Sequence, residues 1–172
     1  MKSKKEKAHK TCDKYEIFSH LTNFDYLVPM SKSGIFIGID PDVELNGYAL
    51  WHSNSKILEV GKETFWDIIE DIEDYKKDNV PLTVIIEAGW LIPKSNWHGA
   101  KSKGTAAKIG KNVGSNHQVG RLLEAYCIHN KIPHRLTKPQ GKVKAEYFKK
   151  LTGYQGRTNQ DMRDAGLLVF NM

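Results

Sequence analysis

The stretch IFIGIDPDVELNGYALWH, residues 35–52, carries the pattern that decides the fold. Its first six residues form a nearly continuous apolar run that ends on Asp40, which is typical of a strand buried on both faces. An Asn-Gly turn signal follows, and residues 48–52 are predicted to be a second strand. A third apolar segment at residues 56–60 completes a predicted antiparallel meander of three strands.

Downstream of the meander, apolar residues recur alternately at helical and at strand spacing. The expected elements are a helix over 63–79, a strand over 81–90, a helix over 115–131, a strand over 132–137, and helices over 142–153 and 159–171. Residues 91–112 are rich in Gly, Lys, Ser and Asn without an apolar period, so a long loop is expected there. This order predicts an α/β domain whose five-stranded mixed sheet has three antiparallel strands, then parallel strands, and is flanked by helices.

Length and composition predict one domain with an extension. A chain of 172 residues with 40% hydrophobic content is sufficient for a single core. We expect residues 1–33 to be a basic, partly mobile extension and residues 34–172 to form the domain. No run approaches the roughly 18 apolar residues of a membrane span, and no apolar stretch follows the basic N-terminus, so an intracellular protein is expected. Cys12 and Cys127 are expected to be free thiols.

The charge is distributed unevenly along the chain. Residues 40–87 hold four lysines against twelve acidic residues, whereas residues 88–150 hold thirteen Lys or Arg against two acidic residues. The second segment also contains Trp90 and Trp97, and a basic segment with aromatic side chains suits nucleic acid. On charge alone, a solvated lysine-rich surface explains the segment equally well.

Four acidic residues occupy positions that an apolar pattern does not explain. Asp40 and Glu87 each end a predicted strand, and adjacent strand ends in an α/β sheet open onto one crevice. Asp161 and Asp164 lie on one side of the first turn of the last predicted helix. If that helix packs near the strand ends, four carboxylates converge and require cations to neutralise them. Mg²⁺ or Mn²⁺ would suit oxygen ligands, and two ions ~4 Å apart would serve hydrolysis of a phosphodiester.

Each acidic residue also has an ordinary structural explanation. Asp40 precedes a proline and could begin a turn, and Glu87 could be an unremarkable carboxylate at the end of a strand. Thr158 and Asp161 fit a capping box, and acidic residues suit the first turn of a helix. Capping accounts well for Asp161 and less well for Asp164.

Three motifs in this order resemble the RuvC family of Holliday-junction resolvases, which have the ribonuclease H-like fold. The motifs are IGIDPDVELNGYAL at 37–50, VIIEAGW at 84–90 and NQDMRDAGLLV at 159–169, and the resemblance covers about residues 34–171. It implies a junction-resolving endonuclease that acts on branched DNA as a homodimer. It further implies that the catalytic ligands of two Mg²⁺ or Mn²⁺ ions are Asp40, Glu87, Asp161 and Asp164.

The resemblance also assigns residues that would bind DNA. Trp90 would stack on bases at the junction centre, although a half-buried loop tryptophan is the plainer explanation. Lysines of two segments would contact the DNA backbone: Lys101, Lys103, Lys108 and Lys111 of the predicted loop, and Lys138, Lys142 and Lys144 after the fifth strand. The chain departs from the family at Asp42, where the family has glycine, in the long predicted loop and in the N-terminal extension.

Other functions fit the same sequence less completely. The domain could cut a flap or an RNA–DNA hybrid, or it could be a non-catalytic nucleic-acid-binding module, although all four acidic residues are present. An ATP-binding protein of the actin and sugar-kinase type needs two such domains, and this chain has room for one. His9, Cys12 and His20 could form a zinc site, but their irregular spacing in the extension favours coincidence.

Overall fold

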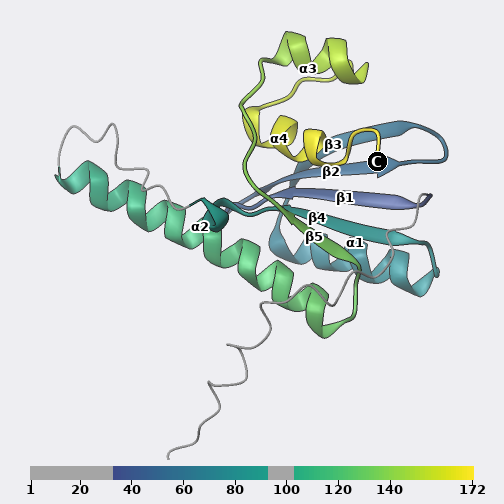
Figure 1. Ribbon diagram of the computed structural model, residues 1–172, viewed down its shortest axis with the longest axis horizontal. Helices are drawn as coiled ribbons and strands as arrows, with labels where there is room; N and C mark the ends of the chain where they lie inside the picture. The colour runs from purple at the N-terminus through teal and green to yellow at the C-terminus, as the bar shows by residue number, and fades with distance from the viewer. Residues whose placement is uncertain (1–32, 93–102) are drawn as a thin grey trace, which may run out of the picture.

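The computed structural model describes residues 33–92 and 103–172, which form a five-stranded mixed sheet (Figure 1). The strands are β1 (Ile35–Asp40), β2 (Asn46–His52), β3 (Ile57–Glu63), β4 (Leu82–Glu87) and β5 (His134–Thr137). They lie in the order β3-β2-β1-β4-β5. The first three pair antiparallel, whereas β4 runs parallel to both β1 and β5. The predicted mixed sheet is confirmed, and this order and direction of strands is that of the ribonuclease H-like fold.

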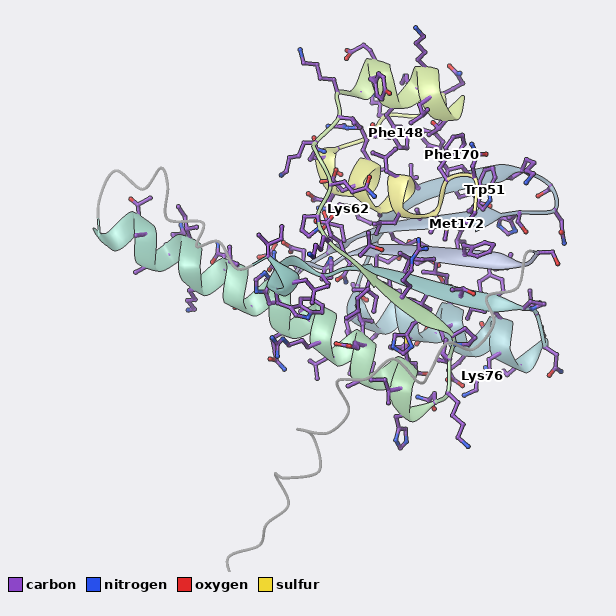
Figure 2. The ribbon with its side chains drawn as sticks, viewed as in Figure 1. Trp51, Lys62, Lys76, Phe148, Phe170 and Met172 are labelled. Carbon is purple, nitrogen blue, oxygen red and sulfur yellow. The ribbon has the colours of Figure 1, made fainter. Side chains whose placement is uncertain are left out.

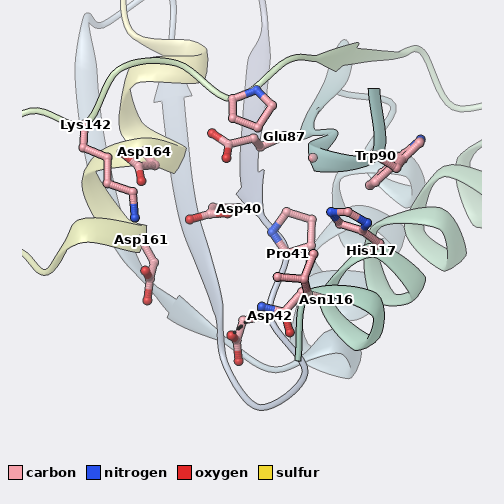
Figure 3. Close-up of a pocket in the computed structure, with 13 residues that line it drawn as sticks. Asp40, Pro41, Asp42, Glu87, Trp90, Asn116, His117, Lys142, Asp161 and Asp164 are labelled. Atoms are coloured by element: carbon pink, nitrogen blue, oxygen red, sulfur yellow. Dashed lines mark hydrogen bonds between the residues drawn. The ribbon is translucent and has the colours of Figure 1, made fainter. Parts of the chain in front are cut away.

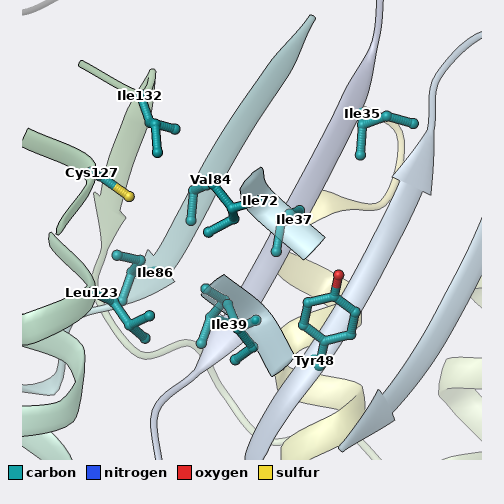
Figure 4. Packing of buried hydrophobic residues seen from close by; sticks show 11 residues of the cluster. Ile35, Ile37, Ile39, Tyr48, Ile72, Val84, Ile86, Leu123, Cys127 and Ile132 are labelled. Atoms are coloured by element: carbon teal, nitrogen blue, oxygen red, sulfur yellow. The ribbon is translucent and has the colours of Figure 1, made fainter. Parts of the chain in front are cut away.

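Helices cover both faces of the sheet. α1 (Phe65–Lys77) and α2 (Lys103–His129) pack on one face, where alternate residues of β1 and β4 such as Ile37 and Ile86 meet them (Figure 4). α4 (Gln160–Val169) packs on the other face, and α3 (Ala145–Thr152) lies beyond α4 (Figure 1). Side chains of a strand alternate between faces, so each face has its own apolar cluster.

The prediction of a long loop over residues 91–112 is wrong for residues 103–112, which are helical. A short 3₁₀ turn, η2 (Gly89–Leu91), follows β4, and α2 already begins at Lys103 and continues for 27 residues. Ala106, Ile109 and Val113 are half-buried at helical spacing, but the glycines and lysines between them hid this period in the sequence. The first part of α2 extends past the sheet (Figure 1).

The capping box expected at the start of the last helix is also wrong. The N-cap of α4 is Asn159, whose side-chain oxygen accepts a hydrogen bond from the backbone N–H of Met162 at 2.9 Å. Thr158 Oγ1 instead accepts from the guanidinium of Arg163 at 3.3 Å. Because Asn159 already caps the helix, capping no longer explains the presence of Asp161.

Several predictions concern residues outside the described ranges. The proposed extension lies almost entirely there, as do His9, Cys12, His20, Trp97 and Lys101.

Cys127 is a buried free thiol, and burial raises its pKa to about 12, so it is poorly reactive. Within residues 33–92 and 103–172, no helix combines the length and apolar character needed to cross a membrane.

Candidate active site

Two glycines let α4 approach the sheet closely. A Cβ atom on Gly38 of β1 would collide with the carbonyl oxygen of Ala165, and one on Gly47 of β2 would collide with that of Asp161. The backbone of α4 therefore rests directly on β1 and β2, with its first turn beside the end of β1. This contact carries Asp161 and Asp164 to the strand ends.

The four acidic residues singled out in the sequence line one pocket at the carboxyl ends of β1 and β4 (Figure 3). Asp40 ends β1, Glu87 ends β4, and Asp161 and Asp164 come from the first turns of α4. The pocket is also lined by Pro41, Asp42, Gly89, Trp90, Val113, Asn116, His117, Pro139 and Lys142. The four carboxylates therefore come from segments that are far apart in the sequence: β1 and β4 supply one each, and α4 supplies two.

The electrostatics of the pocket favour protons or cations. The pKa of Asp40 is raised to about 8, first by burial and then by the neighbouring charges of Glu87, Asp164 and Asp161. The pKa of Glu87 is raised to about 7, by burial and by Asp164. Burial likewise raises the pKa of Asp164. The ammonium group of Lys142 opposes the shift at Asp40, Glu87 and Asp164, but only in part.

The donor set fits a hard divalent cation, although the carboxylates are not gathered around one point. Among the residues that the structure describes, no group of three or more His, Cys, Asp or Glu side chains is arranged to hold a metal ion. Two of the carboxylates have other partners: Asp161 forms an ion pair with Lys62 at 3.0 Å, and Asp164 accepts a hydrogen bond from Gln160 at 2.6 Å. Carboxylate oxygens are nevertheless the ligands that Mg²⁺ and Mn²⁺ prefer, and repulsion among them is relieved by such an ion.

The predicted DNA-binding lysines lie in different places. Lys142 lines the pocket, whereas Lys138 and Lys144 are exposed on the segment that leads from β5 to α3. Lys108 and Lys111 are exposed on α2 and do not line the pocket. Lys103 is the first residue of α2, and Lys101 lies outside the described residues. Of the lysines whose side chains the structure describes, Lys142 is the one that lines the pocket with the carboxylates.

Trp90 lines the pocket and also packs against α2. Its ring lies so close to Gly120 that a Cβ atom there would collide with it. The guanidinium of Arg121 lies 5.7 Å from the ring centre, and the ring of His117 meets it edge-on at 5.9 Å. Burial and Arg121 lower the pKa of His117. Trp90 is thus half-buried, as the plainer explanation expected, while it remains part of the pocket.

Asp42, the departure from the family pattern, connects the β1–β2 loop to α2. One carboxylate oxygen accepts from the side-chain amide of Asn116 at 2.9 Å, and the other accepts from the backbone N–H of Glu44 at 3.0 Å. Sequence reasoning missed Asn116 and His117, which line the pocket, and Arg121, which lies over the Trp90 ring, because their positions depend on how α2 packs. It also missed Arg163, which donates to the carbonyl of Val143 at 3.0 Å and thereby ties the segment bearing Lys142 to α4.

Comparison with known proteins finds similarity in three dimensions only. The chain is similar to the structure of Thermus thermophilus RuvC in complex with a Holliday junction substrate, with a TM-score of 0.45 and 14% identity over 80% of this chain and 91% of that one. It is similar to a further structure of Thermus thermophilus RuvC, with a TM-score of 0.39 and 15% identity over 80% of this chain and 92% of that one. No protein-family model and no curated protein matches the sequence. The fold assignment rests on the order and direction of the strands.

Proposed function

We propose that this chain is a metal-dependent, structure-selective DNA endonuclease of the RuvC type that resolves four-way junctions. The observation that carries the proposal is the position of four carboxylates in one pocket at the strand ends beside the first turns of α4, two of them with strongly raised pKa values. A protein gains no stability by burying mutually repelling carboxylates, so such a cluster is characteristic of a functional site.

Asp40, Glu87, Asp161 and Asp164 would hold Mg²⁺ or Mn²⁺, as two ions per site. When bound, such ions supply Lewis-acid activation of water and stabilise the leaving oxygen of a phosphodiester. Asp40 and Glu87 extend from adjacent parallel strands, which hold their backbone positions rigidly. Lys142 on the rim of the pocket would contact a phosphate of the strand to be cut.

Recognition would depend on the shape of the DNA and on its backbone. Lys138 and Lys144 flank Lys142 on the exposed segment before α3, and Lys103, Lys108 and Lys111 extend the positive charge along α2, with Lys101 just before it. Trp90 would stack on an unpaired base from its position at the pocket wall. We propose that residues 34–172 form the nuclease domain, that residues 1–33 form an extension, and that two copies pair so that symmetrically related strands are nicked.

A second candidate, a non-catalytic nucleic-acid-binding module of the same fold, is favoured by the absence of a preformed metal-binding group among the described side chains. Two other nuclease substrates, a flap and an RNA–DNA hybrid, are compatible with the same carboxylates. Cleavage of these substrates side by side separates the possibilities.

The experiment compares four substrates in the presence of Mg²⁺ or Mn²⁺: a four-way junction, a flap, a linear duplex and an RNA–DNA hybrid. The protein is tested beside an Asp40→Asn variant. Paired nicks in the junction that disappear in the variant are the expected result. Cleavage of the RNA–DNA hybrid alone would support nuclease activity but contradict the four-way junction as the substrate. Tight junction binding without cleavage of any substrate would favour the non-catalytic module.

A further inference from the structure

Lys62 lies in one row with Asp40 across the sheet. Asp40 of β1 pairs with Gly47 of β2, and Gly47 pairs with Lys62 of β3. Residues directly opposite each other in antiparallel strands direct their side chains to the same face. Lys62 and Asp40 therefore share the face that α4 covers, with a glycine between them.

The first turn of α4 rests on the middle of this row. Because the carbonyl oxygen of Asp161 occupies the space that a side chain on Gly47 would need, the Asp161 backbone lies between Asp40 and Lys62. The Asp161 side chain thus has an acidic neighbour on one side and a basic neighbour on the other. Figure 2 shows Lys62 beside α4, and in Figure 3 the Asp161 carboxylate points away from Asp40.

The Asp161 carboxylate is bound to the basic neighbour. Its Oδ2 atom lies 3.0 Å from Lys62 Nζ. A different lysine, Lys142, influences Asp40, Glu87 and Asp164. Lys62 is therefore the ion-pair partner that compensates the charge of Asp161.

We propose that Lys62 is a positioning residue that compensates Asp161 in place of a divalent ion and gives up this carboxylate when an ion binds. The proposal rests on the metal site of the proposed function. The side chains of Lys62 and Asp161 are 32% and 40% exposed, and ion pairs with this degree of exposure are weak enough to exchange readily. Lys62 would thus lower the repulsion among the carboxylates of the metal-free pocket. It would also compete with the ion for the Asp161 carboxylate.

Mn²⁺ binding to the full chain tests this competition without any measurement of cleavage. Isothermal titration calorimetry would compare the wild type with Lys62→Met, which keeps an unbranched stem but loses the charge. A matched control is Lys76→Met, since Lys76 also pairs with an acidic residue, Glu73 at 3.3 Å, but on α1 and away from the pocket. Lys62→Met should bind Mn²⁺ roughly three- to tenfold more tightly, because a weak competitor and a repelling cation are both removed. Lys76→Met should bind as the wild type does.

Thermal unfolding provides a second readout. The increase in Tm on addition of Mn²⁺ should be larger for Lys62→Met than for the wild type, because a tighter ligand stabilises the folded state more. If Lys62→Met binds Mn²⁺ as weakly as the wild type or more weakly, Lys62 does not compete with the ion. The metal site itself would stand in that case, provided that Mn²⁺ binding by the wild type is lost in Asp40→Asn. Absence of Mn²⁺ binding in both proteins would overturn the metal site and, with it, the competition.

Discussion

The face of the sheet beneath α1 and α2 is lined by large aliphatic side chains, whereas the face beneath α4 combines an apolar cluster with two glycines and two acidic residues. On the first face, residues such as Ile37, Val84 and Ile86 are fully buried against the helices. On the second, Gly38 and Gly47 admit the backbone of α4, and the strands end in Asp40 and Glu87. Both faces therefore stabilise the domain, and the second also brings a helix to a cluster of carboxylates.

This difference shows how the fold tolerates an unfavourable site. Burying carboxylates next to one another opposes folding, while burying aliphatic side chains favours it by about 25 cal/mol per Å² of apolar surface. Apolar side chains are buried on both faces, but the acidic strand ends Asp40 and Glu87 belong to the α4 face alone, since side chains alternate along a strand. Substitutions on the two faces should therefore have different consequences.

The largest expected effect is on catalysis, from Asp164→Asn. Removal of one carboxylate ligand should reduce cleavage of the preferred substrate by on the order of a thousandfold or more, since bound ions supply several kcal/mol of transition-state stabilisation. Thermal unfolding should change little, because the pKa of Asp164 is raised and its loss of charge relieves repulsion. Asp74→Asn on α1, where Asp74 pairs with Lys77 on the surface, is the matched control and should cleave normally. A large loss of Tm in Asp164→Asn would show that its role is structural.

The next effect is on stability, from Ile37→Ala on the aliphatic face. Ile37 is fully buried, so its truncation should lower the free energy of unfolding by about 2–5 kcal/mol. Denaturant unfolding measures the loss, and Mn²⁺ affinity at a temperature where the variant stays folded should match that of the wild type. Weakened Mn²⁺ binding in the folded variant would mean that the two faces are not independent.

A smaller effect should follow from Gly47→Ala under α4. The added methyl group would collide with the Asp161 carbonyl, and the resulting shift of the helix should cost roughly 1–3 kcal/mol and also weaken Mn²⁺ binding. Gly114→Ala on α2 is the matched control, because nothing lies within 4 Å of its new methyl group. That variant should be slightly more stable than the wild type, since alanine favours a helix. The free energy of unfolding and the Mn²⁺ affinity are measured for both variants. Equal values for Gly47→Ala and Gly114→Ala would contradict the close contact between Gly47 and α4.

The smallest expected effect is a pH-dependent gain in stability from Asp40→Asn. The pKa of Asp40 is raised to about 8 in the folded protein, so the protonated form favours folding. Its contribution is complete below the unfolded pKa near 4 and is lost as the pH rises to about 8. With metal chelated, Asp40→Asn should therefore raise Tm at pH 8 by roughly 2–4 °C, the shift that about 1 kcal/mol produces in a domain of this size. The gain should shrink toward pH 5, and a gain independent of pH would show that Asp40 does not titrate in this range.

The strands and most of the helices could be predicted from the sequence because their patterns are local. Each strand is a short apolar run between turn residues, and α1 shows an apolar period with acidic residues opposite it. The first half of α2 was missed because its glycines and lysines conceal a weak period, and because packing of its second half against the sheet supports the whole helix. The cap of α4 was assigned one residue too early, since Thr158 and Asn159 are both good N-cap residues.

By itself, the sequence determined which residue types were available to the pocket. Two apolar strands that end in acidic residues, and a helix that carries two more, limit the chemistry to oxygen ligands and cations. Only the tertiary structure decided which side chains meet. Lys62 faces Asp161 because of the register of three strands, Gly47 matters because α4 crosses it, and Arg121 reaches Trp90 because α2 lies beneath η2. Register and helix packing join residues distant in the chain, so no local pattern records them.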